Sequence, residues 1–243
     1  MKIAAIIPAR YAATRFPAKL MQLIGNKTVI RHTYDNTAAT NLFDQVIVAT
    51  DSNIIYNEIV SNGGIAKMTT GNHQSGSDRI AEVAQDMDVD IIINVQGDTP
   101  FINKEALKKI IDLFNDEKVQ VASMMQILQE PKFINDPNYV KVVVDKNMNS
   151  LMFSRSVIPY PRDNENEIIY YEHIGVYAFK KEALLSFTNW EMTPLEKAER
   201  IECLRYLENG IPLKMIIVKG IGIEIDTEED LHRANHYLSK NKI

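Results

Sequence analysis

The chain has 243 residues, of which 45% are hydrophobic and 24% charged, the usual balance of a soluble globular protein. A net charge of −5 argues against a general nucleic-acid surface, and no apolar run reaches the length of about 18 residues that a membrane-spanning helix needs. Cys203 is the only cysteine, so no intramolecular disulfide can form. We therefore expect a cytoplasmic protein without a signal peptide, because the apolar run at the N-terminus is too short for one.

Apolar runs alternate with helical patterns through the first half of the chain. Strands are expected at residues 3–8, 45–50, 65–69 and 91–95, and helices at residues 28–40, 53–61, 77–87 and 104–115. These strands show no polar alternation, which indicates burial on both faces. Together with crossover helices, they predict an α/β fold with a mostly parallel, doubly wound sheet.

The pattern changes from about Val119. Strands are expected at residues 119–127, 140–144, 151–153 and 174–179 without regular helices between them, and residues 161–167 are typical of a surface loop. A helix at 195–208, strands at 213–218 and 221–225, and a helix at 228–239 complete the chain. The sequence therefore predicts a smaller mixed, β-rich portion. Because no linker or repeat is visible, we expect one composite domain over residues 1–243.

Three cations, Arg10, Arg15 and Lys19, follow the first expected strand in a single loop. In a doubly wound sheet, ligands gather at the carboxyl ends of the strands. Arginine grips phosphate oxygens in pairs and lysine adds a compact charge, so this loop suits a polyphosphate. A solvated basic loop without a ligand is the alternative. The glycine-rich dinucleotide motif and the Walker motif are both absent here.

Two carboxylates, Asp98 and Asp226, each follow an expected strand. Asp98 would project from the carboxyl end of its strand, where Mg²⁺ can bridge it to phosphate oxygens. The alternative is a turn aspartate that stabilises its own backbone. Alternation places Glu224 and Asp226 on one face, and the capping box of Thr227 and Asp230 does not need Asp226. Asp98 and Asp226 could share a divalent ion.

Ser75, Asp78 and Arg79 lie where a helix is expected to begin. Ser75 and Asp78 have the spacing of a capping box, and Arg79 fits a surface pair. The functional alternative is that polar groups and amides at this N-terminus bind an anion or a base edge.

His173 has the pattern of a core histidine on a strand, and Glu202 with Arg205 fits an (i, i+3) pair on a helix. No Ser/His/Asp triad and no zinc spacing can be argued, and Cys203 has no visible activating partner. Covalent catalysis and transition-metal chemistry are therefore disfavoured.

Nine blocks in chain order resemble the 3-deoxy-manno-octulosonate cytidylyltransferase family, also called CMP-Kdo synthetases. The blocks are IPARYAATRFPAK at 7–19, VATD at 48–51, MTTGNHQSGSDR at 68–79, NVQGD at 94–98, VKVV at 140–143, FSR at 153–155, HIGVY at 173–177, ECLR at 202–205 and IDTEEDL at 225–231. They cover nearly the full length of the chain.

The resemblance implies a nucleotide-diphospho-sugar transferase-like fold and a homodimer. The implied reaction moves CMP from CTP to the anomeric hydroxyl of 3-deoxy-manno-octulosonate (Kdo), releases pyrophosphate and uses Mg²⁺. It would supply activated sugar for lipopolysaccharide synthesis. Residues 1–118 would be mainly nucleotide-binding, 119–220 mainly sugar-binding and dimerising, and 221–243 a metal-ligand strand with a closing helix.

Site residues carry over by position in the matching blocks. The resemblance implies catalytic groups at Arg10, Arg15, Lys19 and Asp98, nucleotide-binding groups at Ala9, Arg10, Gln74, Ser75, Gly76 and Arg79, Mg²⁺ ligands at Asp98 and Asp226, and sugar-binding groups at Arg155, His173, Tyr177 and Glu202.

Four positions depart from the family pattern. Thr99 stands where the family usually has Glu, Cys203 where it commonly has Gln, Thr70 where it often has Arg, and Phe179 where Tyr is common. The nucleotide chemistry is unaffected, but the acidic sugar stays open: 8-amino-Kdo or a sialate are alternatives to Kdo. A non-catalytic nucleotide-binding protein of the same fold is the rival from another class.

Overall fold

The chain folds into two compact units in the computed structural model, which describes residues 1–12, 16–70, 73, 75–162, 168–219 and 223–241. Unit 1 comprises Met1–Lys108 and Ile221–Ile243, and unit 2 comprises Lys109–Gly220. No helix in the described ranges is both long and apolar enough to cross a membrane.

Unit 1 is built on parallel strands, all of which bury side chains on both faces except the edge strand at residues 66–68. These strands are β1 (Ile3–Ala9), β4 (Gln45–Thr50), β5 (Ala66–Met68) and β6 (Ile91–Asn94). Their order is β6-β1-β4-β5, and every pair runs parallel. The apolar strands of the sequence are thus confirmed, and so is the parallel sheet they predict, because only burial on both faces explains runs without polar alternation.

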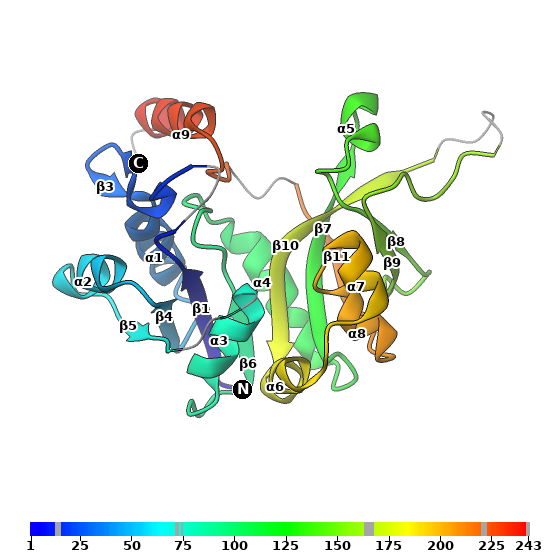
Figure 1. Cartoon of the computed structure of the whole chain (residues 1–243), viewed down its shortest axis with the longest axis horizontal. Coiled ribbons are helices and arrows are strands. Elements are labelled where there is room, and N and C mark those ends of the chain that lie inside the picture. The colour runs from blue at the N-terminus through cyan, green and yellow to red at the C-terminus, as the bar shows by residue number, and fades with distance from the viewer. Residues whose placement is uncertain (13–15, 71–72, 74, 163–167, 220–222, 242–243) are drawn as a thin grey trace. The chain divides into compact units, whose positions relative to one another are not determined.

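The helices of unit 1 begin at the capping residues that the sequence supplies. They are α1 (Val29–Ala39), α2 (Asn53–Ser61), α3 (Gly76–Ala84), α4 (Lys104–Asp112, which continues into unit 2) and α9 (Glu228–Asn241). Thr28 and Ser52 cap α1 and α2 through their hydroxyls, and Ser75 with Asp78 forms a full capping box on α3. Figure 1 shows α1, α2 and α3 beside the four parallel strands.

A short hairpin between β1 and α1 was not expected. After a 3₁₀ turn at Lys19–Met21, β2 (Leu23–Ile24) pairs antiparallel with β3 (Lys27–Thr28). Gly25 turns the hairpin at a φ of +61°, and a Cβ on it would lie 2.8 Å from a Leu238 methyl group. Two-residue strands are too short to produce a periodic pattern.

The strand expected at residues 221–225 is wrong for the part that can be described. Residues 221 and 222 lie outside the described residues, and 223–225 form no strand. Instead, the Ile225 amide donates one hydrogen bond to the Asp98 carbonyl, at 3.0 Å. A single bond to the turn after β6 positions this segment, whereas a strand needs a ladder of such bonds.

Unit 2 contains the mixed, β-rich portion that the sequence predicts. Its strands are β7 (Val121–Leu128), β8 (Lys141–Val144), β9 (Ser150–Ser154), β10 (Tyr170–Lys180) and β11 (Lys214–Ile217). Their order is β11-β7-β10-β8-β9, with only the β11–β7 pair parallel. Residues 163–167 of the expected surface loop lie outside the described residues.

The helices of unit 2 correct two expectations. α5 (Pro131–Asn135) and α6 (Lys181–Asn189) occur where no helix was expected. The single helix expected at 195–208 is wrong: it is divided into α7 (Pro194–Glu199) and α8 (Leu204–Glu208). Arg200 ends α7 with a left-handed φ of 55°, a conformation that stops a right-handed helix. Hydrophobic periodicity continues across the break and hides it.

Candidate functional site

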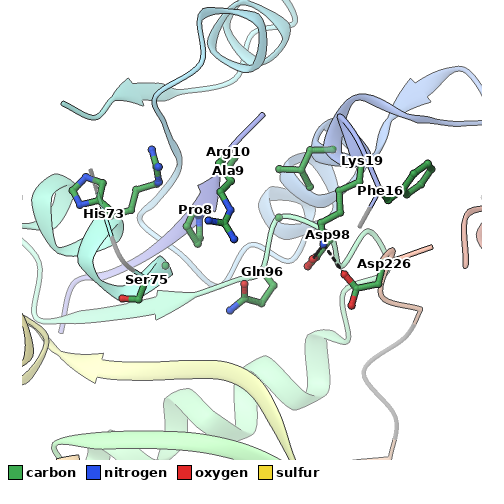
Figure 2. Close-up of a pocket in the computed structure, with 14 residues that line it drawn as sticks. Pro8, Ala9, Arg10, Phe16, Lys19, His73, Ser75, Gln96, Asp98 and Asp226 are labelled. Atoms are coloured by element: carbon green, nitrogen blue, oxygen red, sulfur yellow. Dashed lines mark hydrogen bonds and ion pairs between the residues drawn. The ribbon is translucent and has the colours of Figure 1, made fainter. Parts of the chain in front are cut away.

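A cavity of about 250 Å³ opens at the carboxyl ends of the parallel strands of unit 1 (Figure 2). Its lining residues come from the ends of β1 and β6, the start of α3, the segment around the 3₁₀ turn, and the segment before α9: Pro8, Ala9, Arg10, Phe16, Lys19, Leu20, His73, Ser75, Gly76, Arg79, Gln96, Gly97, Asp98 and Asp226. Ligands of parallel α/β sheets bind at this edge.

The ends of β1 and β6 approach each other closely at Gly97. A Cβ on Gly97 would lie 3.0 Å from the backbone oxygen of Pro8 and 3.3 Å from a methyl group of Ile30. A larger residue would force the Pro8 backbone or its neighbours to shift, so glycine allows this approach and Asp98 projects beside the cavity next to the β1 end. Gln96 also lines the cavity, which the sequence reasoning missed, although it lies two positions before Asp98.

The centre of the site is an ammonium group between two carboxylates. Lys19 Nζ donates to Asp98 Oδ2 at 2.5 Å and to Asp226 Oδ1 at 2.8 Å (dashed in Figure 2). The side chains of Lys19 and Asp98 are 19% and 23% exposed, and that of Asp226 is 45% exposed. Burial alone would lower the pKa of Lys19, but the two carboxylates outweigh burial and raise it above its ordinary value. Lys19 is therefore a cation at neutral pH.

These two carboxylates fit a divalent cation such as Mg²⁺. The Lys19 ammonium shows that one positive centre reaches an oxygen of Asp98 and an oxygen of Asp226 together. Among the described residues, no group of three or more His, Cys, Asp and Glu side chains could hold a metal ion. Mg²⁺ commonly binds one or two carboxylates and takes its other ligands from phosphates and water, which this arrangement allows.

The basic loop is described only in part. Arg10 is exposed and lines the cavity at the end of β1, together with Ala9. Arg15 and Gln74, both implied by the resemblance, lie outside the described residues. Of the three loop cations, Arg10 and Lys19 are brought to the same cavity.

The sequence pattern fits a surface ion pair for Arg79, but the structure buries this residue. It is 6% exposed, donates to Asp51 Oδ2 at 2.7 Å and donates to Thr69 Oγ1 at 2.6 Å. Asp51 follows β4 and Thr69 follows β5, so the ends of two strands fix the guanidinium beside the cavity. The sequence reasoning placed Asp51 in a matching block without a role; its position directly after a buried strand was the available signal.

Three of the four residues implied for the sugar lie near one another in unit 2. The rings of His173 and Tyr177, both on β10, have centroids 5.3 Å apart. Burial, together with the nearby Cys203 and Glu202 side chains, raises the pKa of the Tyr177 phenol. Burial lowers the pKa of His173 to about 3, so its imidazole is neutral at physiological pH.

Arg155 follows β9 in the same unit. Its guanidinium donates to the backbone oxygens of Glu199, at 2.7 Å, and Pro137, at 2.9 Å. Its own amide donates to a carboxylate oxygen of Glu199 at 2.9 Å. Backbone carbonyls orient the guanidinium without neutralising its charge.

Arg205 has a buried carboxylate partner that the sequence did not indicate. Its guanidinium donates to both oxygens of Glu196, at 2.6 and 2.7 Å, and the side chains are 6% and 5% exposed. Glu196 lies on α7 and Arg205 on α8. The break at Arg200 lets the two short helices form this pair.

Comparison with known proteins gives one consistent family. A profile of the cytidylyltransferase family matches residues 4–220. A protein of Flavobacterium johnsoniae named 3-deoxy-manno-octulosonate cytidylyltransferase is 54% identical, over 98% of this chain and 99% of its own length. A protein of Christiangramia forsetii with the same name is 48% identical, over 98% of this chain and 97% of its own.

Solved structures agree with these relatives. The structure of a CMP:2-keto-3-deoxy-manno-octonic acid synthetase complexed with CTP has a TM-score of 0.94 and 33% identity, and covers 99% of this chain and 100% of that one. A 4-diphosphocytidyl-2C-methyl-D-erythritol synthase from Anaerococcus prevotii has a TM-score of 0.66 at 18% identity, with 98% of each chain covered. At that identity the likeness shows the fold alone.

Proposed function

Since this chain belongs to the 3-deoxy-manno-octulosonate cytidylyltransferase family, we propose that it transfers CMP from CTP to the anomeric hydroxyl of Kdo and releases pyrophosphate. The single observation that supports this most directly is the position of the Lys19 ammonium between the carboxylates of Asp98 and Asp226, at the strand ends of unit 1. It combines a phosphate-binding cation with two carboxylates suited to a metal ion.

The triphosphate half of the proposal assigns charge neutralisation to Arg10, Arg15 and Lys19. Transfer of a phosphoryl-type group depends mainly on positioning and charge neutralisation, so no protein nucleophile is needed. Two of these cations line the same cavity as the start of α3.

Ala9, Gln74, Ser75, Gly76 and Arg79 are the further proposed nucleotide-binding residues, beside Arg10. The N-terminus of a helix attracts anions through its unpaired amides and its dipole. Ser75 uses its hydroxyl in the capping box, so its contribution to a ligand would come from the backbone.

Asp98 and Asp226 are the proposed Mg²⁺ ligands. The ion, when bound, would neutralise phosphate charge and lower the pKa of the attacking hydroxyl, replacing a dedicated protein base. Both carboxylates contact the Lys19 ammonium, so they are placed to share one cation.

Arg155, His173, Tyr177 and Glu202 are the proposed sugar-binding groups. Arg155 supplies a positive charge for the sugar carboxylate, since its contacts to Glu199 and Pro137 are with backbone oxygens. His173 is neutral, so it offers a hydrogen bond without adding charge.

Kdo is favoured over the other acidic sugars. The relatives named above carry the name of the octulosonate enzyme. Thr99, whose difference from the family raised the alternative of 8-amino-Kdo, is only 3% exposed, and Cys203 is 1% exposed. A change at either position therefore acts first on the packing around it, so these two differences carry less weight than the sequence suggested.

We also propose a cytoplasmic homodimer that supplies activated sugar for lipopolysaccharide synthesis. Unit 2 exposes large apolar side chains that a second copy could cover: Leu151 is 61% exposed, Tyr160 82% and Ile169 55%. Light scattering after size-exclusion chromatography should give twice the mass of 27.7 kDa. A monomer at all concentrations would refute the dimer and leave the chemistry intact.

Pyrophosphate release tests the reaction directly. With CTP and Mg²⁺, Kdo should support turnover far above 8-amino-Kdo and neuraminate. Asp98→Asn and Lys19→Met should each lower turnover at least about 100-fold, because the first weakens a proposed metal ligand and the second removes a cation proposed to neutralise phosphate charge. Lys27→Met is the matched control: Lys27 pairs with Asp35 outside the cavity and is 47% exposed.

The outcomes separate the two classes of function. Silence with all three sugars, with CTP still bound, would favour the non-catalytic nucleotide-binding protein. Near-normal turnover of Lys19→Met would contradict the assignment of the site. Release with neuraminate alone would keep the chemistry and change the sugar.

A further inference from the structure

Lys19 Nζ contacts one oxygen of Asp98 and one oxygen of Asp226, the two carboxylates proposed to hold the metal ion. We propose that this ammonium is an internal counter-ion, which the arriving triphosphate draws away so that the divalent cation binds tightly only together with the nucleotide. The inference rests on the proposed function, because it takes the triphosphate and the metal from it.

The competition follows from the atoms involved. Lys19 Nζ lies 2.5 Å from Asp98 Oδ2 and 2.8 Å from Asp226 Oδ1. A divalent ion that used these same two oxygens would bind each at about 2.0–2.1 Å, the short distance that Mg²⁺ requires. Two positive centres cannot both bridge one pair of oxygens without strong repulsion. Either the ammonium or the metal ion binds this pair of carboxylate oxygens.

The nucleotide-free site needs this counter-ion. Asp98 is 23% exposed, and an oxygen of each carboxylate lies within 2.8 Å of the same nitrogen. Without a cation the two negative charges would face each other in partly desolvated surroundings.

Lys19 is also placed so that it can leave. Lys19 begins the 3₁₀ turn after Ala18, and its side chain has a flexible stem of four methylene groups. It lines the same cavity as Arg10. A triphosphate in that cavity would offer the ammonium several negative oxygens in exchange for two. Asp226 is 45% exposed, so a metal ion can enter from solvent once the ammonium has left.

The alternative is a fixed structural ion pair. In that case Lys19 would hold the segment before α9 against the end of β6, and the metal ion would bind by other contacts. Removing the ammonium would then weaken metal binding or leave it unchanged. The proposal predicts that removing the ammonium tightens metal binding in the absence of nucleotide. The fixed ion pair predicts that it weakens metal binding or leaves it unchanged.

Manganese binding measured by electron paramagnetic resonance distinguishes them, with Mn²⁺ as the probe and the full-length protein. Without nucleotide, Lys19→Met should bind Mn²⁺ at least tenfold more tightly than wild type. Lys19→Arg keeps a cation and should stay near wild type, as should Lys27→Met on the surface. Asp98→Asn should remove the gain in a Lys19→Met background, which identifies the site.

The nucleotide arm uses a CTP analogue with a methylene bridge between the α- and β-phosphorus atoms, so that no turnover occurs. Wild type should bind Mn²⁺ at least tenfold more tightly with the analogue, and Lys19→Met should show a smaller gain. Equal or weaker Mn²⁺ binding by Lys19→Met without nucleotide would overturn the proposal. The titration involves no sugar and no product, so failure of the proposed reaction in wild type would be seen separately, as absent pyrophosphate release.

Discussion

The buried pair of Arg205 and Glu196 gives a quantitative test of the packing in unit 2. Glu196→Gln keeps the size of the side chain but removes its charge, which leaves Arg205 as a buried cation. Both side chains are at most 6% exposed, and both oxygens of Glu196 accept hydrogen bonds from the guanidinium. Removing one partner of such a pair costs about 3–5 kcal/mol, because the desolvated charge stays behind.

The local contacts of Arg205 favour the lower end of that range. Its guanidinium also donates to the backbone oxygens of Phe187, at 3.2 Å, and Trp190, at 3.3 Å. It lies 3.9 Å from the centroid of the Phe187 ring, a cation–π contact. We therefore expect a loss of about 3 kcal/mol, which corresponds to a fall in Tm of about 6–12 °C for a chain of this size.

Urea unfolding followed by tryptophan fluorescence is the assay. Trp190 is the only tryptophan, and its carbonyl accepts a bond from Arg205, so the signal reports on this region. Replacing both partners, Glu196→Leu with Arg205→Met, should recover at least half of the loss. The exposed pair of Lys132 and Glu130 is the control: Lys132→Met should cost less than about 1 kcal/mol. A Glu196→Gln protein within 1 kcal/mol of wild type would refute the reasoning, because a cost of about 3 kcal/mol is expected.

Three further predictions concern single side chains. Asp51→Asn should raise the KM for CTP about fivefold without changing kcat. The Asp51 carboxylate is 46% exposed, so losing its bond to Arg79 should cost about 1 kcal/mol of CTP binding, and an unchanged KM would contradict this. Gly97→Ala should cost about 1–3 kcal/mol in thermal unfolding and also lower turnover, because its Cβ would lie 3.0 Å from the backbone oxygen of Pro8; a fully active, equally stable variant would show that the strand end moves freely. His173 has a folded pKa of about 3 against 6.5 when unperturbed, so the unfolded chain binds the extra proton and stability falls as pH falls below about 6.5. Wild type should lose about 1.4 kcal/mol per pH unit relative to His173→Gln between about pH 6.5 and 4, and parallel stability curves would rule this out.

Local patterns were sufficient where an element is long and buried on both faces. The strands at the ends of which Arg10 and Asp98 lie were predictable, since an apolar run without polar alternation has one simple explanation. The capping boxes at Ser75 and Thr227 likewise indicated where α3 and α9 begin, because such a side chain acts on amides within three residues of it. The edge of the sheet that carries the cavity followed from those two facts.

Sequence patterns gave wrong predictions where a distant partner or an unusual backbone conformation decides the structure. The helix expected at 195–208 is divided because Arg200 takes a left-handed conformation, which leaves no trace in hydrophobic periodicity. Arg79 is buried by Asp51 and Thr69, from the ends of two other elements, whereas its sequence neighbourhood favours a surface residue.

Lys19 shows most clearly what the sequence by itself determined. Its place after a buried strand, in a basic loop, indicated a phosphate-binding cation at the edge of a parallel sheet, because that information is local. Its contact with Asp226, across 207 residues of sequence, was decided only by tertiary structure. The backbone bond from the Ile225 amide to the Asp98 carbonyl helps to bring the two carboxylates together. Despite burial, the two negative charges, both in contact with the Lys19 ammonium, then raise the pKa of that group.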